Sequence, residues 1–122
     1  MQLETAERLA NAVAVYSQVA VRLLRLTYLA RVEPKTPVEQ EFTTDEVQVL
    51  EGCRQRQEKH AAARVRTIAE AVRVIARLGG HLGRKGGGPP GAKVLWRGLR
   101  SLHDRVQGYQ ISQTRSEDVR NE

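Results

Sequence analysis

Two stretches rich in proline and glycine limit where regular structure can run in this chain of 122 residues. Pro34 and Pro37 interrupt residues 33–40, because proline lacks a backbone N–H and clashes with the preceding helical turn. Residues 79–91 hold seven glycines and two adjacent prolines, and glycine is common where a helix stops. The segments between these breaks are therefore the places where helices or strands can form.

Apolar residues before the first break repeat at helical spacing. In residues 5–32 one stripe steps by four and three residues, with further apolar positions beside it. The stripe consists of Leu9, Val13, Tyr16, Ala20, Leu23 and Thr27, and it is widened by Val15, Val19 and Leu26. Only five residues of the chain are aromatic, so a core has to be built from Leu, Val, Ile and Ala, which suits helix packing. The sequence thus predicts an all-α fold.

Capping signals predict two more helices. Thr43 is followed three residues later by Glu46, the reciprocal pair of a capping box, which predicts a helix over residues 44–57. The same pattern at Thr67 predicts a second capping box and a helix over residues 67–78. The glycine-rich stretch 79–91 then ends that helix as a loop.

Residues 92–110 carry a seam of apolar side chains at the spacing of helices that pack on another helix. The seam consists of Leu95, Leu99, Leu102, Val106 and Tyr109, and Trp96 lies beside it. We predict that these six side chains form an interface with a second copy, with packing onto the first helix as the alternative. Residues 112–122 hold one apolar residue and are expected to be disordered, so the helical domain is predicted to span residues 1–111.

Charge is unevenly distributed along the chain, which carries a formal net charge of +6. Residues 53–103 hold twelve Lys or Arg against two Asp or Glu, whereas residues 1–52 hold five against eight. A basic segment of this kind favours polyanions, above all nucleic acid. The alternative is a solvated surface that keeps the chain in solution.

The residue patterns of catalysis, nucleotide binding and metal binding do not occur. The glycine stretch lacks the Gly-Lys-Ser/Thr ending of a P-loop, because a glycine follows Lys85. One cysteine and three scattered histidines give no metal-ligand spacing. We therefore expect no catalytic residue, metal, cofactor or small-molecule substrate. The lone cysteine, the acidic start and the lack of a long apolar run predict a cytoplasmic protein that does not enter a membrane.

The order of these segments resembles the C-terminal region of bacterial cut-and-paste DDE transposases of the insertion-sequence-four and transposon-five type. The resemblance runs from "LETAERLANAVAVYSQVAVRLLRLTYLAR" through "FTTDEVQVL" to "IARLGGHLGRKGGGPPGAKVLWRGLRSLHDRVQGY". Its most specific parts are "IARLGG" and "LWRGLRSLHDRVQGY", and the distance between them across the glycine stretch also matches.

The resemblance implies a module that pairs two transposase molecules when two transposon ends are brought together, through a segment that matches residues 95–109. It also implies DNA contact at the start of the first helix, while the basic glycine stretch is either a further DNA contact or a plain spacer. The DNA-contact residues predicted in this way are Gln2, Glu4, Arg8, Arg84, Lys85 and Lys93.

In the family, two aspartates and a glutamate bind divalent metal ions such as Mg²⁺ in a domain upstream of the matching segment. The resemblance therefore implies a fragment without catalytic residues of its own. Three functions follow as alternatives: a dimerisation module, a DNA-binding or inhibitory fragment that pairs with full-length transposase, and a remnant without a role.

Overall fold

The structure is a computed structural model of the chain, and it describes residues 2–58, 64–81 and 91–120. Within these residues the chain forms four α-helices and one short 3₁₀ helix. In chain order they are α1 (Gln2–Val32), η1 (Val38–Gln40), α2 (Thr44–Gln57), α3 (Ile68–Leu78) and α4 (Ala92–Arg120). The described residues contain an isolated β-bridge but no strand. The fold is all-α, as the sequence predicts.

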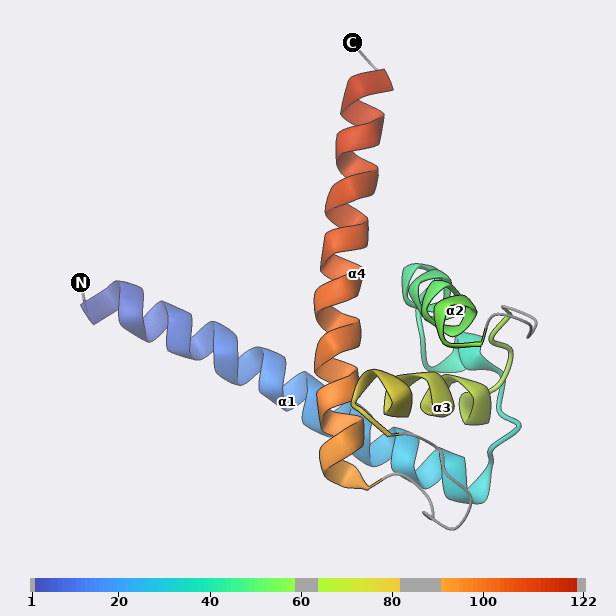
Figure 1. Ribbon diagram of the computed structural model, residues 1–122. Helices are drawn as coiled ribbons and strands as arrows, with labels where there is room; N and C mark the ends of the chain where they lie inside the picture. Colours follow the sequence, from blue (N-terminus) through green and yellow to red (C-terminus); the bar gives the residue numbers. More distant parts are fainter. Residues whose placement is uncertain (1, 59–63, 82–90, 121–122) are drawn as a thin grey trace.

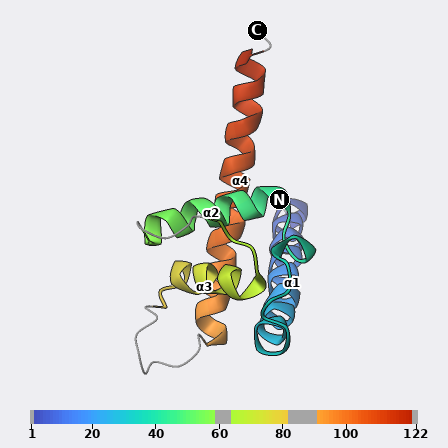
Figure 2. The same cartoon turned by 90° about the vertical axis from the view of Figure 1, so that its right-hand side faces the viewer.

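The two long helices, α1 and α4, cross, and each extends well beyond the crossing (Figure 1). Both shorter helices lie on one side of the crossing, and the view turned by 90° shows α2 and α3 stacked along α4 (Figure 2). Helix α4 contacts each of the other three α-helices. It is therefore the element against which the rest of the chain is assembled.

The two helix starts predicted from capping signals are confirmed, with one difference in detail. Thr43 caps α2, and the capping box is complete: its hydroxyl accepts from the Glu46 N–H at 3.2 Å, while its own N–H donates to the Glu46 carboxylate at 2.9 Å. Thr67 caps α3 through its hydroxyl, but the Glu70 carboxylate accepts from the Arg66 N–H instead, at 2.9 Å. The second capping box is thus only half formed.

The ends of the long helices lie outside their predicted bounds. Helix α1 begins at Gln2 rather than near residue 5, and α4 continues to Arg120 rather than ending near residue 110. The predicted disorder of residues 112–122 is therefore wrong for residues 112–120. Their polar composition opposes burial, but it does not oppose a helix, because neither proline nor glycine follows Gly108. Within the predicted loop 79–91, residues 82–90 lie outside the described part of the chain.

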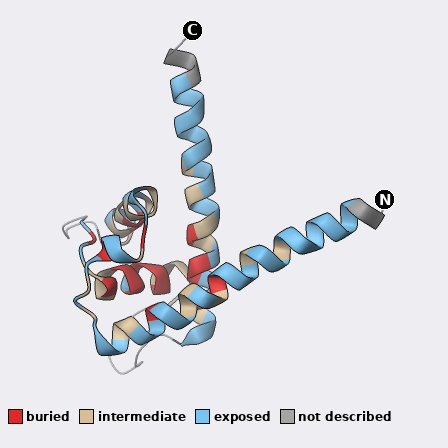
Figure 3. Cartoon of the chain, turned by 180° about the vertical axis from the view of Figure 1, so that it is seen from behind, coloured by how far each residue is buried: buried red, intermediate tan, exposed pale blue. Residues whose placement is uncertain are grey.

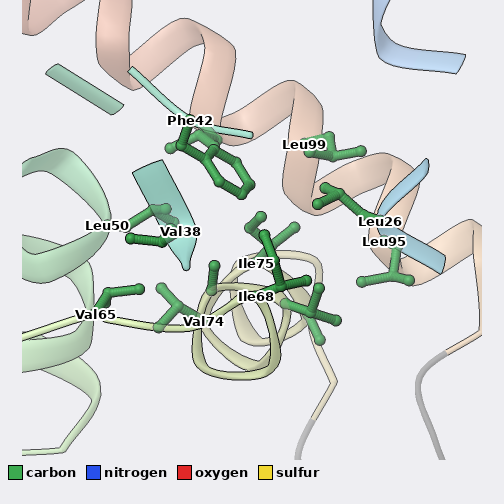
Figure 4. Close-up of a cluster of buried hydrophobic side chains, with 14 of the residues drawn as sticks. Leu26, Val38, Phe42, Leu50, Val65, Ile68, Val74, Ile75, Leu95 and Leu99 are labelled. Carbon is green, nitrogen blue, oxygen red and sulfur yellow. The ribbon is translucent and has the colours of Figure 1, made fainter. Parts of the chain in front are cut away.

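The core lies where α3 is enclosed by the other elements (Figure 3). Its five largest fully buried side chains each have less than 2% of their surface exposed. They are Val38, Leu50, Ile68, Ile75 and Leu102, drawn from η1, α2, α3 and α4. Figure 4 shows Leu26 of α1 and Phe42 joining this group. Every element therefore contributes to one core, as expected for a chain of this length.

Helix α1 buries only one edge of the predicted apolar face, the edge that Val19 and Leu26 form. Val19 and Leu26, two turns apart, are its buried residues, whereas Leu9, Val13 and Tyr16 of the predicted stripe are exposed. Nearly the whole circumference of this helix is apolar, so the sequence supports more than one stripe at helical spacing. The choice between the stripes is made by the neighbours of α1 and not by its own pattern.

Helices α3 and α4 approach so closely that two glycines are required at their contact. A Cβ atom on Gly98 of α4 would lie 1.9 Å from the carbonyl oxygen of Ile75, and one on Gly79 would lie 1.9 Å from that of Val94. Gly80, with a φ of +100°, completes a Schellman turn in which the His81 N–H donates to the Ala76 carbonyl at 2.9 Å. The sequence "RLGG" thus combines a helix stop with a close helix contact.

We expect Gly98→Ala to destabilise the fold by about 1–3 kcal/mol, because the added methyl group overlaps a backbone carbonyl that cannot move without α3. Gly52→Ala is the matched control, since Gly52 is also helical and nothing lies within 4 Å of an added Cβ there. Helix propensity alone should then raise stability by up to about 1 kcal/mol. Thermal unfolding followed by circular dichroism measures both; equal effects of the two substitutions would contradict the close contact.

Candidate functional site

Three leucines of the predicted interface lie in the interior of the chain itself. Leu95, Leu99 and Leu102 are 5%, 3% and 1% exposed. Figure 4 shows Leu95 and Leu99 beside Leu26 of α1. They therefore have no free surface for a second copy, and the alternative of packing within the chain holds for them. The reason is that α4 crosses both α1 and α3. These two helices cover the apolar seam of α4 over its first three turns.

The other predicted interface residues are partly exposed. Trp96 stacks on Tyr16 of α1, with ring centroids 5.9 Å apart and planes inclined by 21°. Val106 packs against the edge of the core. The Tyr109 hydroxyl donates a hydrogen bond to the side-chain Oε1 of Gln48 and accepts one from the side-chain Nε2 of Gln113 at 2.7 Å. A role of these three residues in an interface stays a prediction.

Polar contacts with α2 mark the point where α4 leaves the body of the molecule. Beside the bond from Tyr109 to Gln48, the Gln110 amide donates to the Asp45 carboxylate at 3.1 Å. From Ile111 to Glu117 every side chain is exposed. Figure 1 shows this part of α4 projecting away from the other helices. We call residues 107–117 the projecting end of α4.

The projecting end has one face made of small side chains. Gly108, Ser112 and Ser116 follow one another at four-residue spacing, so they lie along one side of the helix. Ile111, 59% exposed, lies next to them. A shallow hollow in the same region is lined by Gln107, Gln110, Ile111, Thr114 and Arg115. Small residues let another helix approach closely, and an exposed isoleucine offers it an apolar contact.

A second exposed apolar surface lies on α1, and the sequence analysis did not single it out. We call it the outer stripe; it consists of Val21, Leu24, Tyr28 and Val32, which are between 56% and 72% exposed. Their spacing of three, four and four residues is the sequence pattern from which this surface could have been predicted. Exposed apolar side chains in a row usually mark a partner surface.

Ion pairs fix which face of α1 points outward. The Arg22 guanidinium donates to both carboxylate oxygens of Glu46 on α2, and it lies 4.7 Å from the centre of the Phe42 ring. Burial alone would raise the pKa of Glu46, but hydrogen bonds from Arg22 and Thr43 outweigh it, so the pKa lies below its ordinary value of 4.5. This clamp turns Val19 inward and the outer stripe toward solvent.

The residues predicted to contact DNA do not form one group in the described structure. Gln2 and Glu4 lie at the start of α1, and Glu4 pairs with Arg8 at 3.2 Å, both side chains being exposed. Lys93 is exposed in the first turn of α4. Arg84 and Lys85 lie outside the described residues. Their role in DNA contact stays a prediction.

The described residues do not fit the metal ions that the resemblance associates with transposase catalysis. Such ions need several carboxylate ligands at one point. Nowhere in residues 2–58, 64–81 and 91–120 do three His, Cys, Asp or Glu side chains come together in a way that could hold an ion. Among the same residues there is also no helix with the length and apolarity that crossing a membrane requires.

The family model of the transposase Tn5 dimerisation domain matches residues 18–119. The chain belongs to this family. No curated protein and no solved structure matches the chain. The residues matched to the Tn5 dimerisation domain include the outer stripe of α1 and the whole projecting end of α4, so both exposed surfaces lie inside the matched range.

The clamp predicts how the stability of this Tn5-type domain depends on pH. Because the pKa of Glu46 is lowered by folding, its contribution is present above about pH 4.5 and is lost as the pH falls through the lower folded value. We expect Arg22→Met to cost roughly 1–2 kcal/mol at pH 7, with a smaller difference from the wild type at pH 3. Arg8→Met, which removes an exposed pair, is the control and should change little. Urea unfolding at pH 7 and pH 3 measures the free energy of unfolding of each protein. If the difference between Arg22→Met and the wild type is as large at pH 3 as at pH 7, the ion pair of Arg22 and Glu46 does not stabilise the fold in this way.

Proposed function

We propose that this transposase dimerisation domain pairs two copies through the projecting end of α4 and so serves to hold two transposase molecules together in DNA transposition. The observation that carries the proposal is a helix end that continues for more than two turns without support from the other described residues. Isolated helical turns are marginal in water, because their nucleation is costly and no packing stabilises them. A second helix laid against the small-residue face would supply that packing.

The chemistry of the projecting end suits a helix of the same kind. Gly108, Ser112 and Ser116 allow two backbones to approach, and Ile111 of each copy would be covered by the other. An interface between identical surfaces is satisfied by two-fold symmetry, in which each patch meets its own copy. Among the predicted interface residues, Val106 and Tyr109 adjoin this surface, and Tyr109 holds the root of the projecting end in place.

Two finer points belong to the same proposal. The parent transposases are of the cut-and-paste DDE type, as the motifs "IARLGG" and "LWRGLRSLHDRVQGY" indicate by resemblance. The start of α1, with Gln2, Glu4 and Arg8, contacts the DNA that the paired molecules hold. A chain that pairs with full-length transposase could also inhibit it, by replacing one functional copy in the pair. The domain works in the cytoplasm, where the bacterial chromosome lies.

Single substitutions test which surface makes the pair. We expect Ile111→Asp and Ser112→Asp to raise the dimer dissociation constant at least about tenfold, which corresponds to about 1.4 kcal/mol, because each puts a charge into the packed face. Helical content should remain near that of the wild type, since both residues are exposed. Light scattering over a range of concentrations, with circular dichroism, measures both properties.

Leu24→Asp on the outer stripe is the matched control, because Leu24 is 72% exposed and lies on the other long helix. It should leave self-association unchanged. If Leu24→Asp separates the copies and the α4 variants do not, the outer stripe is the interface and the proposal is wrong. Leu99→Asp shows the contrasting behaviour of a core position: the chain should unfold, because an unpaired carboxylate is costly to bury.

We also expect the chain by itself to leave DNA uncut. The two-metal mechanism needs a cluster of carboxylates, and the family match is to a dimerisation domain. Incubation of the purified chain with transposon-end DNA and Mg²⁺ or Mn²⁺ should give no cleavage product. A nick that depends on added metal, and that Glu70→Gln or Asp104→Asn abolishes, would contradict this expectation.

A further inference from the structure

Four arginines in the body of the molecule are neutralised by a carboxylate. Arg22 and Arg25 of α1 pair with Glu46 and Glu41, respectively. Arg54 of α2 pairs with Glu70 at 3.1 Å. Arg77, in the last turn of α3, pairs with Glu58 at 3.2 Å. The basic residues that could attract a polyanion are therefore fewer than the composition suggests.

The first half of α4 carries several cations without such a partner on a single helix. We call four of its exposed residues the basic stripe: Lys93, Arg97, Arg100 and Arg105. Within the described chain none of the four has a carboxylate within ion-pair distance. The nearest acid in sequence, Asp104, is also exposed and unpaired among the described residues. The stripe thus keeps a local net charge of +3 that no neighbour compensates.

Helix geometry places the four residues on one side of α4. At 100° per residue they fall within about 140° of the helix circumference. Lys93, Arg97 and Arg100 lie on the side away from the buried seam, and Arg105 lies at the margin of the seam. Twelve residues separate Lys93 from Arg105, which makes the stripe about 18 Å long. Double-stranded DNA carries about one charge per 1.7 Å of its axis, so a duplex laid along the stripe presents roughly ten phosphates to four cations.

One member of the stripe is held in position by an aromatic ring. The Arg100 guanidinium carbon lies 5.0 Å from the centre of the Tyr16 ring, and Tyr16 in turn stacks on Trp96. A guanidinium over a ring is attracted to its face while its N–H groups stay available to an acceptor. Arg100 is therefore a partly ordered cation, which loses less side-chain freedom on binding a phosphate than a free arginine does.

We infer that the basic stripe of α4 binds the phosphate backbone of double-stranded nucleic acid without reading its sequence. This inference rests on the proposed role in transposition for the identity of the duplex, but it assigns the contact to Arg97, Arg100 and Arg105 together with Lys93. An anionic membrane is a poorer fit, because a helix that lies in a bilayer surface needs a free apolar face, and that of α4 is buried. An acidic protein is a poorer fit, because the exposed stripe has no apolar centre for an interface.

The test is the binding of a random-sequence 20-base-pair duplex to the whole chain, followed by fluorescence anisotropy at several salt concentrations. With about four phosphate contacts, the affinity should fall roughly a hundredfold between 50 and 200 mM salt. The double variant Arg97→Gln/Arg100→Gln should bind at least about tenfold more weakly at 50 mM salt and should flatten the salt dependence by one to two contacts. The single variant Arg97→Gln, which touches no described partner, should show about half of this effect.

A control with the same charge separates a defined surface from net charge. Arg31→Gln/Arg56→Gln also removes two exposed cations from a chain of formal net charge +6, but it does so on α1 and α2. It should keep most of the wild-type affinity. Equal losses in the two double variants, unchanged binding by Arg97→Gln/Arg100→Gln, or no binding by the wild type at 50 mM salt would each overturn the inference.

The outcome is separate from that of the dimerisation proposal. The Ile111→Asp variant should still bind the duplex through the stripe of each single chain, although it no longer pairs. Anionic phospholipid vesicles serve as the second ligand in the same titration. Binding to vesicles with no binding to the duplex would assign the stripe to a membrane and would likewise overturn the inference.

Discussion

The contact between the backbones of α3 and α4 sets the position of every other element. Gly98 lies against the carbonyl of Ile75, and Gly79 lies against that of Val94, so each helix supplies the glycine that lets the other approach. A contact this close fixes the distance and the crossing of the two helices, because no side chain intervenes that could repack. Since α4 also touches α1 and α2, the direction in which α4 projects follows from two missing Cβ atoms.

The sequence predicts local structure, such as where a helix starts, but it does not predict which face of a helix is buried. Thr43 and Glu46 lie three residues apart, which is enough to specify the start of α2, because a capping box uses only local atoms. The face of α1 depends instead on Arg22 and Glu46, which are distant in sequence and meet only after α1 and α2 have packed. Because most of the surface of α1 is apolar, the ion pairs of its charged residues determine which face is buried.

The seam of α4 shows the same limit in another form. Its spacing predicted that Leu95, Leu99 and Leu102 pack against a helix, but spacing does not reveal whether that helix belongs to the same chain. The structure answers this through Gly79, at the end of α3, and Gly98, within α4, which let α4 pack closely on α3. The prediction of disorder at the polar end of α4 is wrong for the opposite reason. A segment with few apolar residues cannot be buried, but it can still be helical, and residues 109–120 contain no helix breaker.

The two proposed contacts use successive lengths of the same helix, and electrostatics explains why they need to be separate. If two copies met along the basic stripe, Lys93 and Arg97 of one copy would face those of the other, and like charges in contact oppose association. The small-residue face is centred on Ser112, seven residues beyond Arg105, the nearest member of the stripe, which is about 10 Å along the helix. That exceeds the screening length of about 8 Å at physiological ionic strength, so pairing at the projecting end brings little repulsion between the stripes. Because α4 passes from one surface to the other without a break, a pair formed at its end would also hold the two basic stripes at a fixed angle to each other.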